Sequence, residues 1–183
     1  STVCTPNFDA LAQRGTLFQN TYTSCPLCVP ARAGFLTGQH SSQNHVYSNA
    51  GAIAEDQATF LHSLVAAGYQ TVLVGRMHFV GPDQRHGFNK RIGGDFCHTF
   101  WPSYGPDDEW MQNIDTYVHT TGQRGALRVV GGGGVSPARE YDLAVTEWAI
   151  NHLQETHDAP QCIVVGTYGP HFPYVAEAER FSN

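Results

Sequence analysis

Three short segments of this chain carry side chains that can do chemistry together. Cys28 offers a nucleophilic sulfur and is followed four positions later by Arg32. Arg76 and His78 are two residues apart, and His171 follows a Gly-Pro pair near the end of the sequence. Guanidinium groups bind tetrahedral oxyanions, and imidazole exchanges protons near neutral pH. A few convergent arginines and histidines around one nucleophile favour an anionic substrate.

The pattern around Cys28 predicts how this residue is positioned. Residues 31–37 have helical spacing and end at Gly38, and the alternating run Thr16–Thr23 predicts a strand that leads to Cys28. Cys28 is then at or just before a helix N-terminus, where unpaired amides and the helix dipole favour an anionic nucleophile beside an anion. Arg32 lies one turn later, within reach of the nucleophile.

The remaining elements alternate between helix and strand. Helical spacing is expected over 5–15, 55–67 and 139–155, and apolar runs predict strands over 69–74 and 161–167. The long helix presents one apolar face, made of Tyr141, Ala144, Val145, Trp148, Ala149 and Leu153. This order predicts an α/β fold with a mainly parallel sheet flanked by helices. Chemistry in such sheets gathers at the carboxyl ends of the strands, where Cys28, His78 and His171 are each expected to follow a strand.

These three segments together resemble one enzyme family. Cys28-Val-Pro-Ala-Arg32, continued by Leu-Thr-Gly38, resembles the sulfatase signature Cys-x-Pro-(Ser or Ala)-Arg with Leu-Thr-Gly. Gly75-Arg-Met-His78 resembles the sulfatase block Gly-Lys-(Trp or Met)-His, with Arg76 in place of the lysine, and Pro-His171-Phe-Pro resembles the Pro-His-x-Pro motif. The chain is similar to the N-terminal portion of a sulfatase catalytic domain of the alkaline-phosphatase-like fold, and most similar to the choline-sulfatase branch.

The resemblance implies a role for each residue. Cys28 is oxidised after translation to formylglycine, and one hydroxyl of its hydrated aldehyde attacks the sulfur of a sulfate ester. Arg32 holds the diol, Arg76 and His171 bind sulfate oxygens, His171 protonates the leaving oxygen, and His78 contacts the formylglycine hydroxyl and helps to expel sulfate. The family also holds calcium or magnesium, for which Cys28 in its modified form is the one ligand in this sequence. We therefore expect the 183-residue chain alone to be inactive or nearly so.

Several alternatives remain open from the residues alone. A phosphonate or phosphate monoester hydrolase of the same superfamily would use the same nucleophile, and a non-catalytic sulfatase-like binding module would keep only the scaffold. The spacing Cys25-x-x-Cys28 also suits a redox pair or half a zinc site, and Cys28 as an inert buried thiol is a further interpretation.

The run from Gly81 to Val135 lacks periodicity and is rich in glycine, proline, histidine and aromatic residues. We interpret about 81–138 as an irregular insertion within a single catalytic-domain portion over 1–183. Three aromatic side chains of this run are candidates for a cation–π contact with a quaternary ammonium group or for packing: Trp101, Tyr104 and Trp110. The adjacent pair Asp107 and Asp108 suits a solvated turn.

Composition sets limits on partners and compartment. The formal net charge of −6 and the scattered basic residues argue against nucleic acid as a partner. No apolar run is long enough to span a membrane, so we expect no membrane partner. Five cysteines are too few and too irregular for a disulfide framework, which favours the cytoplasm and leaves the periplasm or secretion open. The expected partners are a small sulfated substrate and a second copy in a homo-oligomer.

Overall fold

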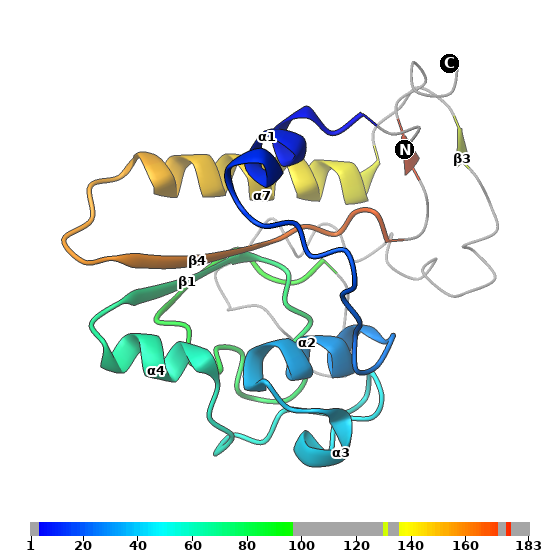
Figure 1. Cartoon of the computed structure of the whole chain (residues 1–183), viewed down its shortest axis with the longest axis vertical. Coiled ribbons are helices and arrows are strands. Elements are labelled where there is room, and N and C mark those ends of the chain that lie inside the picture. Colours follow the sequence, from blue (N-terminus) through cyan, green and yellow to red (C-terminus); the bar gives the residue numbers. More distant parts are fainter. Residues whose placement is uncertain (1–3, 97–129, 132–135, 172–174, 177–183) are drawn as a thin grey trace.

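The computed structural model describes residues 4–96, 130–131, 136–171 and 175–176, and its centre is a parallel sheet (Figure 1). The strands are β1 (Gln70–Gly75), β2 (Lys90–Ile92) and β4 (Gln161–Gly166), in the order β2-β1-β4. Val72 is opposite Lys90 of β2 on one side and Ile163 of β4 on the other. A separate parallel pair joins β3 (Val130–Gly131) to β5 (Val175–Ala176). The predicted parallel α/β architecture is confirmed.

Helices cover both faces of this sheet. Figure 1 shows α7 (Pro137–Gln154) on one side and α2 (Cys28–Thr37) and α4 (Phe60–Ala66) on the other. Two further helices, α1 (Pro6–Arg14) and α3 (Ser41–Asn44), complete the described set. Among the described residues, no helix is both long and apolar enough to cross a membrane.

The alternation of side chains along β1 creates two separate cores. Val72 and Val74 point toward α7 and pack with Tyr141 and Val145. Leu73 points to the opposite face and belongs to a cluster with side chains of α2 and α4, such as Leu61. Successive strand residues face opposite sides, so a strand buried on both faces is apolar at every position. This explains why the run over 69–74 showed no alternation in the sequence.

The strand expected over Thr16–Thr23 is absent, and this prediction was wrong. The segment has no regular structure, and Phe18 and Tyr22 expose 77% and 89% of their surface. Its threonines bond to nearby carbonyls instead, Thr21 to Phe18 and Thr23 to Cys25. Such local bonds offer the backbone an alternative to sheet pairing, and no described strand is paired with this segment. Cys28 therefore does not follow a strand.

Three smaller predictions are corrected as well. The helix expected over 55–67 begins only at Phe60, because the Nδ1 atom of His62 accepts the Thr59 N–H at 3.0 Å and sets its start there. On α7 the buried face runs through His152, while Leu153 is 63% exposed. The insertion at about 81–138 contains β2 and β3, so it is not wholly irregular. Trp101, Tyr104, Trp110 and the pair Asp107 and Asp108 lie outside the described residues.

Candidate active site

Cys28 is the first residue of α2, which places its side chain at the N-terminus of a helix as predicted. Leu27 precedes it in an extended conformation, and Gly38 ends the helix with φ +68°, a conformation that favours glycine. Val29 and Leu36 anchor α2 in the core. The Cys28 thiol is half-buried and free of any disulfide. The packing of α2, rather than a preceding strand, fixes its position.

Arg32 reaches from α2 toward the loop that follows β1. Its Nη1 atom donates to the Arg76 carbonyl oxygen at 3.5 Å and contacts the Met77 sulfur at 3.7 Å. Burial, and next the positive charge of Arg76, lower the pKa of Arg32, whereas Asp95 and Cys28 raise it. Arg32 therefore lies within electrostatic reach of both Cys28 and the residues that follow β1.

The loop after β1 brings Arg76 and His78 together. Arg76 is 2% exposed, and its Nη2 atom donates to the Nδ1 atom of His78 at 3.1 Å. The Arg76 guanidinium also lies over the Tyr168 ring, 5.0 Å from its centroid. Its Nε atom is buried without a protein acceptor. A buried guanidinium with an unused donor is a ready site for an anion.

His78 is held neutral by its surroundings. Burial, followed by the positive charge of Arg76, lowers its pKa to about 4, and Arg32 and His171 act in the same direction. Because a guanidinium can only donate, the Nδ1 atom of His78 is the acceptor and its proton is on Nε2. His78 thus presents one N–H donor on the side away from Arg76. His78 also has φ +57°, which is unusual for a residue with a side chain.

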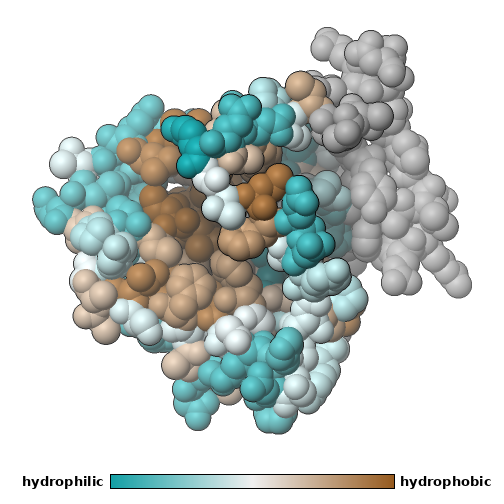
Figure 2. All heavy atoms as spheres, in the orientation of Figure 1, coloured by the Kyte–Doolittle hydropathy of each residue, from teal (hydrophilic) through white to brown (hydrophobic). Residues whose placement is uncertain are grey.

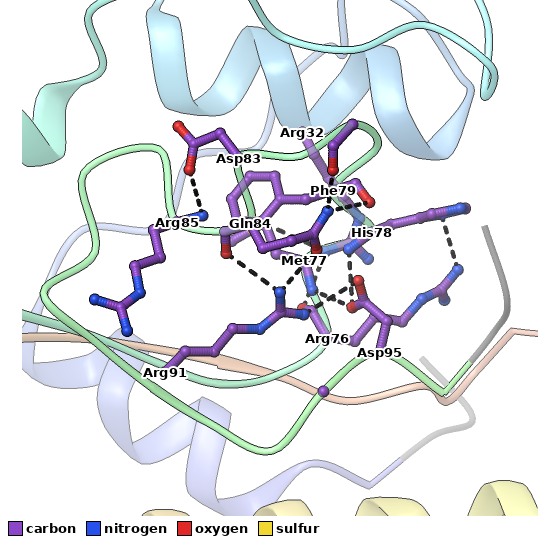
Figure 3. A network of polar contacts seen from close by, with 12 residues as sticks. Arg32, Arg76, Met77, His78, Phe79, Asp83, Gln84, Arg85, Arg91 and Asp95 are labelled. Atoms are coloured by element: carbon purple, nitrogen blue, oxygen red, sulfur yellow. Dashed lines mark hydrogen bonds and ion pairs between the residues drawn. The ribbon is translucent and has the colours of Figure 1, made fainter. Parts of the chain in front are cut away.

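Asp95, which the sequence did not reveal, holds this loop in place (Figure 3). Its Oδ1 atom accepts the N–H groups of Met77 and His78 at 2.8 and 3.0 Å. Its Oδ2 atom lies 3.2 Å from the Arg91 guanidinium, and its side chain is fully buried. A carboxylate that accepts two consecutive backbone donors fixes the direction of that backbone. Asp95 is therefore a positioning residue for His78.

Glycines at the ends of β1 and β4 allow a close approach of the two chains. The Arg76 N–H donates to the Gly166 carbonyl at 2.8 Å. A Cβ atom on Gly166 would overlap the Arg76 carbonyl, and one on Gly75, which has φ +82°, would overlap the Gly166 carbonyl. Only glycine fits at both positions, so the turn that aims Arg76 depends on them.

The loop after β4 carries His171 and is held in a similar way. Asp142 of α7 accepts the Tyr168 N–H at 2.6 Å and the Gly169 N–H at 2.9 Å. The His171 N–H donates to the Tyr168 carbonyl at 3.1 Å, and the two rings lie 4.9 Å apart. Since Tyr168 also stacks under Arg76, His171 joins the cluster of Arg32, Arg76 and His78.

Cys28, Arg32 and Arg76 line one cavity of about 450 Å³. Its other walls come from α2 and from the end of β4, including Phe35 and Val165. Figure 2 shows apolar atoms gathered in the hollow between the α7 side of the molecule and the α2 and α4 side. The structure thus brings Cys28, Arg32 and Arg76 to one cavity. His78 and His171 are not among the residues that line it; His78 contacts Arg76 from the same loop, and His171 lies close enough to affect the pKa of His78.

The same region does not hold a complete site for a hard cation. Calcium and magnesium need about six oxygen ligands. In the part of the chain that the structure describes, Asp95 beside this cluster is occupied by Arg91 and two backbone donors, and Asp142 is occupied by the Tyr168 and Gly169 N–H groups. The single group of three or more metal-ligating side chains among the described residues lies elsewhere, at His152, Glu155 and His157. The described residues alone therefore provide no complete metal site beside Cys28.

Fold and site together define an α/β protein with a cavity, lined by two arginines and a cysteine, beside the carboxyl edge of its sheet. The Sulfatase family model matches residues 1–183. A choline-sulfatase of Rhizobium meliloti is 41% identical over 181 residues, which cover 93% of this chain and 34% of that protein. Human N-acetylgalactosamine-6-sulfatase is 33% identical over 131 residues, 62% of this chain and 24% of its own length. The chain belongs to the sulfatase family.

Solved structures agree with this fold. The structure of BT4656 in complex with its substrate D-glucosamine-2-N,6-O-disulfate aligns with a TM-score of 0.62 and 28% identity, over 94% of this chain and 31% of that one. A phosphonate monoester hydrolase of Agrobacterium radiobacter aligns with a TM-score of 0.67 at 23% identity, over 97% and 38% of the two chains, which supports the fold alone. The chain spans about a third of the length of the curated choline-sulfatase. The family implies a formylglycine and a divalent metal.

Proposed function

We propose that the intact protein hydrolyses a sulfate ester with a formylglycine nucleophile derived from Cys28. The observation that carries this proposal is the unused donor of a buried cation: Arg76 is 2% exposed, and its Nε atom has no protein acceptor. A sulfate oxygen would supply the missing acceptor and the missing negative charge. Arg32 adds a second guanidinium next to the thiol. Two cations beside one nucleophile stabilise the charge that develops on the oxygens of a transferring sulfuryl group.

Each side chain then has a separate task. The hydrated aldehyde of Cys28 supplies an oxygen nucleophile at the positive end of the α2 dipole. Arg32 orients that group, and Arg76 binds the sulfate. The neutral His78 donates its Nε2–H to a hydroxyl of the nucleophile or to the ester. His171 protonates the leaving oxygen, which is a general-acid role suited to imidazole.

The metal of the intact protein is proposed to be calcium or magnesium, and its carboxylate ligands would come from outside the described residues. When bound, such an ion neutralises negative charge next to the nucleophile. We propose a small sulfated alcohol as substrate, and the 41% identity with a choline-sulfatase makes choline sulfate the first compound to test. The cytoplasm remains the proposed compartment.

Steady-state kinetics of the intact protein on matched aryl sulfate and aryl phosphonate esters test this function. We expect Cys28→Ala to lower kcat/KM on the sulfate by at least about 1,000-fold, since the nucleophile is lost. Cys25→Ala is the matched control, because Cys25 lines the same cavity but takes no part in the proposed reaction. A higher kcat/KM on the phosphonate would favour the phosphonate hydrolase, and equal activity of the Cys28 variant would overturn the proposal.

A further inference from the structure

A second group of reactive side chains lies at the end of α7, away from Cys28. His152 is in the last turn of this helix, and Glu155 and His157 follow in the loop before β4. One ligand atom from each residue can be chosen so that all three lie within 4.8 Å of one another. Lys90, the first residue of β2, also approaches this group. The cluster is therefore at the edge where β2 and β4 begin, whereas Arg76 follows the end of β1.

His152 is the residue whose state needs an explanation. It is 3% exposed, and neither of its ring nitrogens has a hydrogen-bond partner in the protein. Its Nδ1 atom lies 3.4 Å from the Glu155 Oε2 atom. Buried polar groups nearly always have partners, because leaving one unpaired costs about 1–3 kcal/mol. A ligand between the imidazole and the carboxylate would satisfy both.

His157 is already in the form that binds a metal. Its Nε2 atom lies 2.8 Å from the His152 carbonyl oxygen, and a carbonyl can only accept, so Nε2 carries the proton. The lone pair is then on Nδ1. Metal-bound histidines commonly donate their second ring N–H to a backbone carbonyl in this way, which fixes tautomer and ring orientation. The two imidazole rings are 4.5 Å apart, centroid to centroid.

We propose that His152, Glu155 and His157 bind a divalent transition metal of the zinc class. Two imidazoles and one carboxylate suit such an ion better than calcium or magnesium, which prefer oxygen ligands throughout. Water would fill the remaining position. Lys90 forms an exposed ion pair with Glu155 at 3.8 Å, and its side chain is 51% exposed and free to turn away. The ion would tie the last turn of α7 to the loop that leads into β4.

Titration of the chelator-treated intact protein with Co²⁺ and then Zn²⁺ tests this site. The probe is the visible absorption of four-coordinate Co²⁺, and displacement by Zn²⁺ gives the zinc affinity. A Cys28→Ala background with excess Mg²⁺ and Ca²⁺ ensures that neither this thiol nor the proposed hard-cation site adds Co²⁺ binding. Glu155→Gln and His157→Ala should each weaken binding by more than about tenfold, since loss of even an outer partner costs 10–100-fold. Asp158→Asn is the matched control, because Asp158 is an exposed acidic residue three positions from Glu155.

Three results of the titration are distinguishable. One Co²⁺ bound per chain, weakened by the Glu155 and His157 variants and unchanged by the Asp158 variant, supports the site. No binding with Co²⁺ in excess overturns it and leaves His152 and Glu155 as a plain ion pair. Binding that is unaffected by Glu155→Gln and His157→Ala also overturns it, because the metal is then elsewhere. Far-ultraviolet circular dichroism of each variant shows that loss of binding is not loss of fold.

Discussion

The substitution Asp95→Asn tests whether a buried carboxylate holds the loop that carries His78. Asparagine keeps an oxygen to accept the Met77 and His78 N–H groups, but it removes the charge and turns a donor toward Arg91. Removing one partner of a buried ion pair costs about 3–5 kcal/mol. The Asp95 and Arg91 atoms are close, at 3.2 Å, but are not aligned as a hydrogen bond. We therefore expect the lower end, about 3 kcal/mol of unfolding free energy.

Asp83→Asn is the matched control for this experiment. Asp83 also accepts two backbone N–H groups, at 2.8 and 3.1 Å, and lies 3.2 Å from the His86 imidazole. Its side chain is 32% exposed, whereas that of Asp95 is fully buried. Water replaces the lost interactions at Asp83, so the cost there should be about 1 kcal/mol.

Equilibrium urea unfolding, followed by circular dichroism, measures both variants. The expected result is a loss for Asp95→Asn that exceeds the Asp83→Asn loss by about 2 kcal/mol, with unchanged denaturant slopes. Adding Arg91→Met to Asp95→Asn should recover part of the loss, because the unpaired charge is gone. Equal losses for the two aspartates would contradict this prediction, since burial of the carboxylate would then make no difference to its contribution.

Three further predictions concern the same loops. His78 has a pKa of about 4 in the folded protein, against the ordinary value of 6.5. As pH falls, the unfolded chain therefore binds a proton at this residue before the folded protein does. Acidification from pH 6.5 to 4 should then lower the unfolding free energy by at most about 3 kcal/mol. Urea unfolding at both pH values should show that His78→Gln loses less unfolding free energy on acidification than the unsubstituted protein does. An NMR titration that gives the His78 ring a pKa near 6.5 would contradict this prediction. Gly166→Ala should cost at least about 2 kcal/mol in the same urea assay, because its Cβ meets the Arg76 carbonyl, and Gly15→Ala should cost far less. Arg76→Lys, which restores the usual lysine of the motif, should keep sulfate ester hydrolysis within about tenfold, whereas Arg76→Ala should lower kcat/KM by about 100-fold or more; a fully active alanine variant would exclude Arg76 from sulfate binding.

The sequence predicted those elements whose hydrophobic pattern matches the face that they bury in the fold. The strands β1 and β4 were predicted from their apolar runs, and α7 because its apolar residues recur at helical spacing. β1 is buried from Thr71 to Gly75, whereas β4 is only partly buried and its Val165 is 46% exposed. β2 was missed because it has only three residues and two are charged. The prediction of a strand over Thr16–Thr23 was wrong because strand-forming residues need a partner strand, and no described strand pairs with this segment.

The sequence predicted the site residues that belong to short motifs, but not those that act through contacts between distant segments. Cys28, Arg32, Arg76, His78 and His171 stand in motifs with fixed spacing, so their grouping was visible in the sequence. Asp95 and Asp142 were not, because each binds backbone N–H groups that are distant in sequence or belong to another element. In the sequence alone, a carboxylate in a glycine-rich run is typical of a solvated turn, and only the folded structure shows that it is buried and bound to backbone N–H groups. Leu153 was misplaced because the buried stripe of α7, at Tyr141, Val145 and Ala149, continues three positions on to His152.

Mass spectrometry of the peptide that contains Cys28, from intact protein purified out of its native host, shows whether this residue becomes the formylglycine nucleophile. We expect the thiol to be replaced by an aldehyde, which borohydride reduces and which carbonyl-reactive probes label, while Cys25 in the same peptide remains a thiol. An unmodified thiol at Cys28 in protein that hydrolyses sulfate esters would contradict it.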